Sequence, residues 1–185
     1  AMAGGDWARA RELLDRPDAT APERVSLAAV HEQVGELDLS ERLLAACADE
    51  LDAERQPHAC ATMHTVRGHV ARRRGDLAGA RRHFTAACEL FQRIGHARHA
   101  ASEQLNLGVV AKDLGEHQEA VERFREARAL YEHVGDVGRA AIASANLGIA
   151  ALARGDVETA RATLDDAARR LLGLGDRAAG RLAAV

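Results

Sequence analysis

Two series of glycines recur at one fixed interval along this chain of 185 residues. Both series have a spacing of 40 residues, and their members are Gly68, Gly108 and Gly148 in the first and Gly75, Gly115 and Gly155 in the second. A fixed period of about 20 to 50 residues is typical of proteins in which one structural unit is copied along the chain. The period therefore predicts a stack of equal units.

Side-chain size follows the same register as the glycines. Small residues occur at Ala80, Ala120 and Ala160, and large apolar residues occur at Phe84, Phe124 and Leu164. Protein interiors are close-packed, so a large side chain in one element needs a small one opposite it. The shared interval predicts that every unit interlocks in the same way.

Each unit has the pattern of two helices. Ala120, Phe124, Ala127 and Tyr131 are spaced by four, three and four residues, which places them on one face of a helix. Gly115 lies before this helix, where a glycine can take the left-handed conformation that ends the preceding helix. Aromatic residues make up only 3% of the chain, which argues against a sheet. The sequence therefore predicts an all-α fold.

The first glycine series needs a structural reason, because these glycines lie inside predicted helices. A glycine there costs about 1 kcal/mol relative to alanine. We expect the second helix of each hairpin to cross the first at this glycine, so that no side chain fits. Gly108 would then lie against the helix that carries Ala120 and Phe124.

The order of small residues at 108, 120 and 127 and an aromatic residue at 124 resembles the tetratricopeptide repeat. Segments such as NLGVVAKDLGEHQEAVERFREARALYEHVGD are similar to a subclass with repeats of about 40 residues in bacterial signalling and transcription regulators. The resemblance implies a right-handed α-solenoid of antiparallel helical hairpins. Both helices should be longer than in the common repeat of about 34 residues.

The repeat covers almost the whole chain, and we expect a single domain over residues 2–185. Its expected parts are a partial repeat at 5–16, full repeats at 22–54, 57–95, 97–135 and 137–175, and a terminal partial helix at 176–185. Solenoids usually end in polar caps, whereas this chain ends in Leu182, Ala183, Ala184 and Val185. These features predict a segment of a longer array or a unit that stacks on another copy.

The resemblance also implies that the first helices of the hairpins line a concave groove. The groove positions that we single out are His69, Arg72, Arg73, Ser102, Asn106, Val109, Lys112, Asn146 and Ile149. Corresponding positions also hold Ile142 and Leu152. Asn106 and Asn146 precede Leu-Gly in successive repeats, and an asparagine amide can donate to and accept from a peptide backbone. The basic residues favour an acidic ligand, unless they only form a solvated helix face.

Several classes of function are disfavoured. The net charge of -3, with acids and bases interspersed, does not provide the basic patch that nucleic-acid binding needs. The chain contains no apolar run of about 20 residues and no signal peptide, which predicts a cytoplasmic protein outside the membrane. No catalytic or nucleotide-binding motif occurs, so we predict neither an enzyme nor a cofactor. The pairs Cys60/His64 and His96/His99 have no evident third ligand, which argues against a metal site.

Three functions remain open. The first is a scaffold that binds an unidentified protein or peptide in the groove, as part or relative of a larger signalling or regulatory protein. The second is a self-assembly module that forms a homodimer. The third is a small-molecule sensor.

Overall fold

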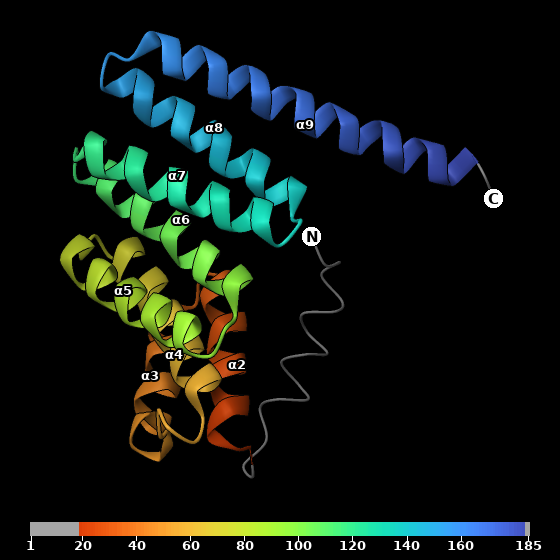
Figure 1. Cartoon of the computed structure of the whole chain (residues 1–185). Coiled ribbons are helices and arrows are strands. Elements are labelled where there is room, and N and C mark those ends of the chain that lie inside the picture. Colours follow the sequence, from red (N-terminus) through yellow and green to blue (C-terminus); the bar gives the residue numbers. More distant parts are fainter. Residues whose placement is uncertain (1–18, 184–185) are drawn as a thin grey trace. The chain divides into compact units, whose positions relative to one another are not determined.

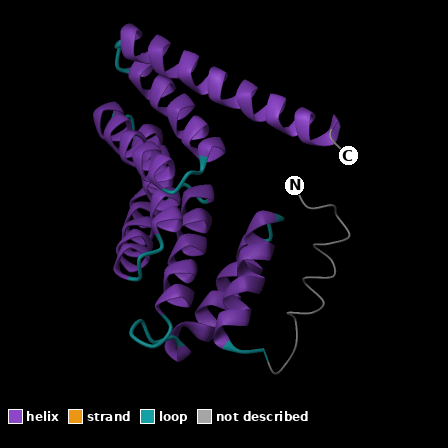
Figure 2. Cartoon of the chain, turned by 45° about the vertical axis from the view of Figure 1, so that its right-hand side comes forward, coloured by secondary structure: helices purple, strands orange, loops and turns teal. Residues whose placement is uncertain are grey.

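The computed structural model describes residues 19–183, so the partial repeat expected at 5–16 lies outside the described residues. Within this part, the chain forms eight α-helices and one short 3-10 helix, and it contains no strand (Figures 1 and 2). The predicted all-α fold class is confirmed. Neighbouring helices pair as hairpins, α2 with α3, α4 with α5, α6 with α7 and α8 with α9.

The chain divides into two compact units between Gly95 and His96. The first unit contains α2 (Ala21–Gln33), α3 (Leu37–Cys47), the 3-10 helix (Ala48–Glu50), α4 (Pro57–Arg73) and α5 (Leu77–Arg93). The second unit contains α6 (Ala97–Asp113), α7 (His117–His133), α8 (Val137–Ala153) and α9 (Val157–Ala183).

The 40-residue period is made of two long helices and two short links. Helices α4 to α8 each contain 17 residues, and the links between them contain three residues each. In the α4–α5 link, Gly75 has a φ of 83°, a left-handed conformation that ends α4. The backbone N–H of Asp76 then donates to the carbonyl of Ala71 at 2.9 Å. The Asp76 carboxylate accepts from the N–H of Gly79 at 2.8 Å, which caps α5.

The glycines inside the first helices lie directly against a large side chain of the second helix. A Cβ atom added to Gly68 would be 2.5 Å from Cε1 of Phe84, and one added to Gly108 would be 2.6 Å from Cε1 of Phe124. Both separations are far below van der Waals contact. Both phenylalanines are fully buried. The helices of these hairpins can therefore approach this closely only where the first helix has no side chain.

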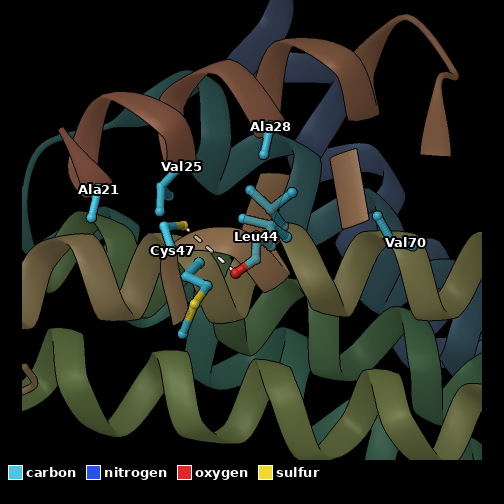
Figure 3. Close-up of a cluster of buried hydrophobic side chains, with 8 residues drawn as sticks. Ala21, Val25, Ala28, Leu44, Cys47 and Val70 are labelled. Atoms are coloured by element: carbon cyan, nitrogen blue, oxygen red, sulfur yellow. Dashed lines mark hydrogen bonds between the residues drawn. The ribbon is translucent and has the colours of Figure 1, made fainter. Parts of the chain in front are cut away.

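Each unit has an apolar core of its own. In the first unit, the core residues are Ala21, Val25 and Ala28 of α2, Leu44 and Cys47 of α3, and Met63, Val66 and Val70 of α4. Figure 3 shows the α2 and α3 side chains converging on the α4 helix. In the second unit, Phe124 packs with Leu147 of α8, and Tyr131 packs with alanines of α6 and α8.

Helix α9 differs from the expected arrangement at its C-terminal end. We expected the repeat at 137–175 to end at Gly175 and a separate partial helix to follow at 176–185, but α9 continues without interruption to Ala183. Gly95 and Gly135, the equivalent glycines, have φ values of 72° and 71° and end α5 and α7. Gly175 does not have a positive φ. The helix continues through it, so the backbone N–H and C=O groups of residues 176–183 are paired within the helix.

Candidate functional site

The predicted groove residues come from the first helices of three hairpins. His69, Arg72 and Arg73 lie on α4 in the first unit. The other residues lie in the second unit, with Ser102, Asn106, Val109 and Lys112 on α6 and Asn146 and Ile149 on α8. Their contacts decide which of them are available to a ligand.

Two of the three basic groove residues, Arg73 and Lys112, have acidic partners within their own units. Nε of Arg73 lies 3.1 Å from Oε1 of Glu32, and its Nη1 donates to the Glu32 carbonyl at 2.8 Å. Burial raises the pKa of the Glu32 carboxyl, and the charges of Arg73 and Arg72 oppose that rise. In the second unit, Nζ of Lys112 lies 3.7 Å from Oδ1 of Asp113. Much of the positive charge on these faces is therefore balanced internally.

His69 is part of the packing of the α4–α5 hairpin. Its ring meets the ring of Phe84 edge to face, with the centroids 5.0 Å apart. Burial is the largest cause that lowers the pKa of His69 to about 4, and the nearby charges of Arg72 and Arg73 lower it further. The imidazole is therefore neutral at neutral pH and supports the fold at this position.

The polar residues of α6 and α8 make local hydrogen bonds. Nδ2 of Asn106 donates to Oε2 of the buried Glu103 at 3.3 Å, and Nδ2 of Asn146 donates to the Ile142 carbonyl at 3.0 Å. Both asparagines are half-buried. The hydroxyl of Ser102 lies 2.9 Å from that of Tyr131 and joins α6 to the end of α7. Ser102 is thus a packing residue, whereas the two asparagines keep part of their amide surface exposed.

Apolar side chains form the most exposed part of the first-helix face of α8. The exposed fractions are 49% for Ile142, 50% for Ile149 and 55% for Leu152. The sequence places Ile142 and Leu152 at groove positions, but polarity alone did not single them out. On α6, Val109 is half-buried and packs against the cluster that contains Leu147 of α8. Val109 of α6 therefore packs against a core to which α8 also contributes.

A pair of facing histidines was not found from the sequence. Nδ1 of His64 on α4 lies 3.1 Å from Nδ1 of His83 on α5. Burial lowers the pKa of both imidazoles, and Arg67 lowers both further. The equivalent residues one repeat later, Gln104 and Arg123, are also hydrogen-bonded, at 3.2 Å. Both positions hold polar residues in two successive repeats. This recurrence in the sequence could have indicated that the two positions pair across the helices.

Two surface hollows lie at the links of hairpins. One has a volume of about 510 Å³ and lies around the α2–α3 link, where Nδ1 of His31 contacts Oε2 of Glu36 at 2.5 Å. The other has a volume of about 670 Å³ and lies around the α6–α7 link, beside Glu119 and Arg123. Neither hollow includes a predicted groove residue.

Two further searches covered the part of the chain that the structure describes. Within residues 19–183, no group of three or more histidine, cysteine or acidic side chains is arranged to hold a metal ion. Over the same residues, no helix combines the length and the apolar character that a membrane span requires. The three cysteines are buried free thiols.

The sequence profile of the tetratricopeptide repeat matches residues 58–133 and 98–172. These overlapping matches together cover more than half of the chain, so the protein belongs to the tetratricopeptide-repeat family. The resemblance inferred from the glycine period is confirmed. No curated protein matches the sequence.

Solved structures share the fold at low sequence identity. BtubC (BKLC) from P. vanneervenii is 19% identical, with a TM-score of 0.75 over 92% of this chain and 75% of that chain. MamA is 16% identical, with a TM-score of 0.70 over 95% of this chain and 99% of that chain. A Rap protein complexed with competence and sporulation factor is 18% identical, with a TM-score of 0.75 over 85% of this chain and 44% of that chain. This chain thus matches less than half of the Rap protein, and these likenesses concern the fold.

Proposed function

We propose that the protein is a non-catalytic, cytoplasmic scaffold whose second unit binds a peptide or helix of a partner protein. The binding face consists of the exposed surfaces of α6 and α8 around Asn106, Asn146, Ile142 and Ile149. Membership of a repeat family with extended binding surfaces supports this proposal. The solved complex of a structurally similar Rap protein with competence and sporulation factor is in keeping with it.

The observation that carries the proposal is the combination of exposed apolar side chains with amide groups on one helix face. Ile142, Asn146 and Ile149 follow one another at spacings of four and three residues, so they lie on the same side of α8. Ile142 and Ile149 are each about half exposed. Such a face offers apolar contacts to side chains of a ligand and hydrogen-bonding groups to its backbone.

An apolar ligand fits this face better than an acidic one. The acidic-ligand hypothesis relied on Arg72, Arg73 and Lys112. Arg73 is engaged by the buried Glu32 and Lys112 by Asp113, so a ligand carboxylate would have to compete with existing partners. We therefore expect the ligand to present leucine, isoleucine or aromatic side chains.

Selection from a phage-displayed library of random 15-residue peptides tests the proposal. Peptides selected on the wild-type protein would be labelled, and their affinity measured by fluorescence polarisation. Ile149→Asp places a charge in the apolar face, and we expect it to weaken binding at least tenfold. Because Ile149 is half exposed, the substitution should leave the fold intact, which circular dichroism would verify.

Leu114→Asp is the matched control. Leu114 is 43% exposed, but it lies in the link between α6 and α7. This variant should bind the selected peptides as the wild type does. Equal affinity of wild type and Ile149→Asp would overturn the assignment of the face.

A further inference from the structure

Two histidines from different helices face each other across the α4–α5 hairpin. The Nδ1 atoms of His64 and His83 lie 3.1 Å apart, and the ring centroids are 5.4 Å apart. Both side chains are half-buried, so each keeps some access to solvent. The two residues are 19 positions apart in the chain, so ligand spacings within one helix do not detect the pair.

The separation of the two nitrogen atoms suits two imidazole ligands of one metal ion. A zinc–nitrogen bond is about 2.0 to 2.1 Å long. Two such nitrogens are about 2.9 Å apart when they meet the ion at a right angle and about 3.3 Å apart at the tetrahedral angle. The 3.1 Å between Nδ1 of His64 and Nδ1 of His83 lies within this range. Rotation of the two rings can therefore direct both nitrogens at one ion without a shift of the helices.

The protonation state of both histidines favours metal binding. A metal ion binds the neutral imidazole and competes with protons for it. Burial is the largest cause that lowers the pKa of His64 and of His83. Both rings are therefore mostly neutral at pH 7. One Nδ1 proton can join the two nitrogens by a hydrogen bond, and an ion would take the place of that proton.

Arg67 is a nearby group whose charge opposes a bound cation. Its Nε lies 3.7 Å from Oε1 of Glu41 on α3, so an acid partly balances the charge. Around His83, the charges of Glu41 and Asp76 oppose those of Arg67 and Arg82. The surroundings therefore hold acids as well as bases and do not exclude a divalent cation.

The equivalent positions of the following hairpins do not hold two metal ligands. Gln104 and Arg123 stand there one repeat later, and Ser144 and Thr163 two repeats later. An arginine side chain has no acceptor nitrogen to offer an ion. The paired imidazoles therefore distinguish the α4–α5 hairpin from the α6–α7 and α8–α9 hairpins.

From this geometry we infer that His64 and His83 form a binding site for one divalent transition-metal ion, such as Zn²⁺, through their Nδ1 atoms. Imidazole nitrogen is a preferred ligand of such ions. Water fills the other coordination positions, since residues 19–183 gather no group of three or more suitable side chains. The bound ion links α4 to α5. The site belongs to the first unit and the proposed peptide face to the second, so either proposal can fail alone.

Isothermal titration calorimetry of the whole chain with ZnCl₂ tests the site. We expect one Zn²⁺ to bind per chain. His64→Gln and His83→Gln should each weaken binding at least tenfold, because each leaves a single imidazole. Glutamine occupies the equivalent position 104 and can still hydrogen-bond to the remaining histidine, so the hairpin should be retained. Circular dichroism would verify the fold of both variants.

Two control variants address the other pairs that could hold an ion. His99→Gln makes the same chemical change at an exposed histidine whose ring centroid lies 5.6 Å from that of His96. Cys60→Ala removes the buried thiol that lies one helical turn before His64. Both variants should bind Zn²⁺ as the wild type does. Absence of binding, or binding that either control weakens as strongly as His64→Gln does, would overturn the proposal.

Long-range ¹H–¹⁵N NMR spectra of the histidine rings identify the nitrogens that bind. Added Zn²⁺ should shift the Nδ1 signals of His64 and His83 together and leave the proton of each ring on Nε2. The Nδ1 signal of His99 should not change. A shift confined to other histidines would contradict the assignment.

Discussion

Hairpin α4–α5 of the first unit and hairpin α6–α7 of the second unit have the same helix crossing but different polar pairs beside it. At the crossing, Gly68 meets Phe84 and Gly108 meets Phe124, with nearly equal spacing. Beside the crossing, the first hairpin pairs two histidines, whereas the second pairs a glutamine with an arginine. The comparison shows that the repeat preserves the contact between glycine and phenylalanine, whereas the polar pair beside this contact varies.

Packing volume explains why the contact between glycine and phenylalanine is preserved. A phenylalanine ring inside a closely packed hairpin leaves no alternative to glycine opposite it, whatever surrounds the pair. The neighbouring positions need only a pair of side chains that hydrogen-bond to each other across the helices. Protonation can therefore affect the first hairpin through its histidines, while the arginine of the second keeps its charge.

Truncation of the crossing aromatic residues should have the largest effect. Phe84→Ala and Phe124→Ala each remove a fully buried ring, and we expect each to lower the free energy of unfolding by about 3 to 5 kcal/mol. Urea denaturation followed by circular dichroism measures the change. Leu164→Ala, at the equivalent but partly exposed position of α9, should cost clearly less. Equal losses at all three positions would contradict the comparison.

Acid should destabilise the first hairpin through His69. Its pKa is about 4 in the folded protein and about 6.5 in an unfolded chain, so the unfolded state binds the proton more readily. Stability should thus fall as the pH decreases from about 6.5 towards 4, by about 2 to 3 kcal/mol in total. His69→Val introduces the residue found at the equivalent position 109. Urea denaturation at several pH values should show a smaller loss in this variant, and an unchanged pH dependence would exclude His69 as the cause.

Enlargement of the crossing glycines should have an intermediate effect. Leucine at position 68 or 108 would overlap the phenylalanine ring, and we expect a loss of about 1 to 3 kcal/mol from overpacking. Thermal unfolding of Gly68→Leu and Gly108→Leu would measure it. Similar losses in both hairpins would support a shared crossing. If either variant melts like the wild type, the ring is free to move aside, and the packing argument fails for that hairpin.

Loss of both groove asparagines should have the smallest effect on stability. Alanine at positions 106 and 146 removes two local hydrogen bonds but improves helix propensity, so the net change should be within about 0.5 kcal/mol. Binding of the selected peptides should nevertheless weaken, because the amides face the proposed ligand. Fluorescence polarisation and thermal unfolding of the double variant separate the two effects. Unchanged peptide affinity would show that the asparagines do not contact the ligand.

The fold class could be predicted because its causes recur at a constant interval. Gly108, Ala120 and Phe124 belong to one unit, and their spacing within the chain indicates how its two helices meet. The course of the chain beyond Gly175 could not be predicted in this way. A glycine permits a turn but does not require one, and here the helix continues.

The candidate site was less predictable, because the contacts that decide which of its residues are available include some between helices of different hairpins. Arg73 has the spacing of a groove residue, but its partner Glu32 lies on α2 and belongs to the preceding hairpin. Only the packing of α2 beside α4 brings the two side chains together. The exposure of Ile142 and Ile149 likewise depends on which neighbouring helix covers each side of α8. Local sequence spacing contains no such information.

A double-mutant cycle between positions 108 and 124 tests most directly whether the glycine and the ring interlock. The cycle compares Gly108→Ala in the wild type with Gly108→Ala in Phe124→Leu, using urea denaturation. We predict that the added methyl group destabilises the protein when the ring is present and has little effect, or a stabilising one, when leucine makes room. The coupling energy should be at least about 1 kcal/mol. Additive effects, with no coupling beyond experimental error, would contradict the account.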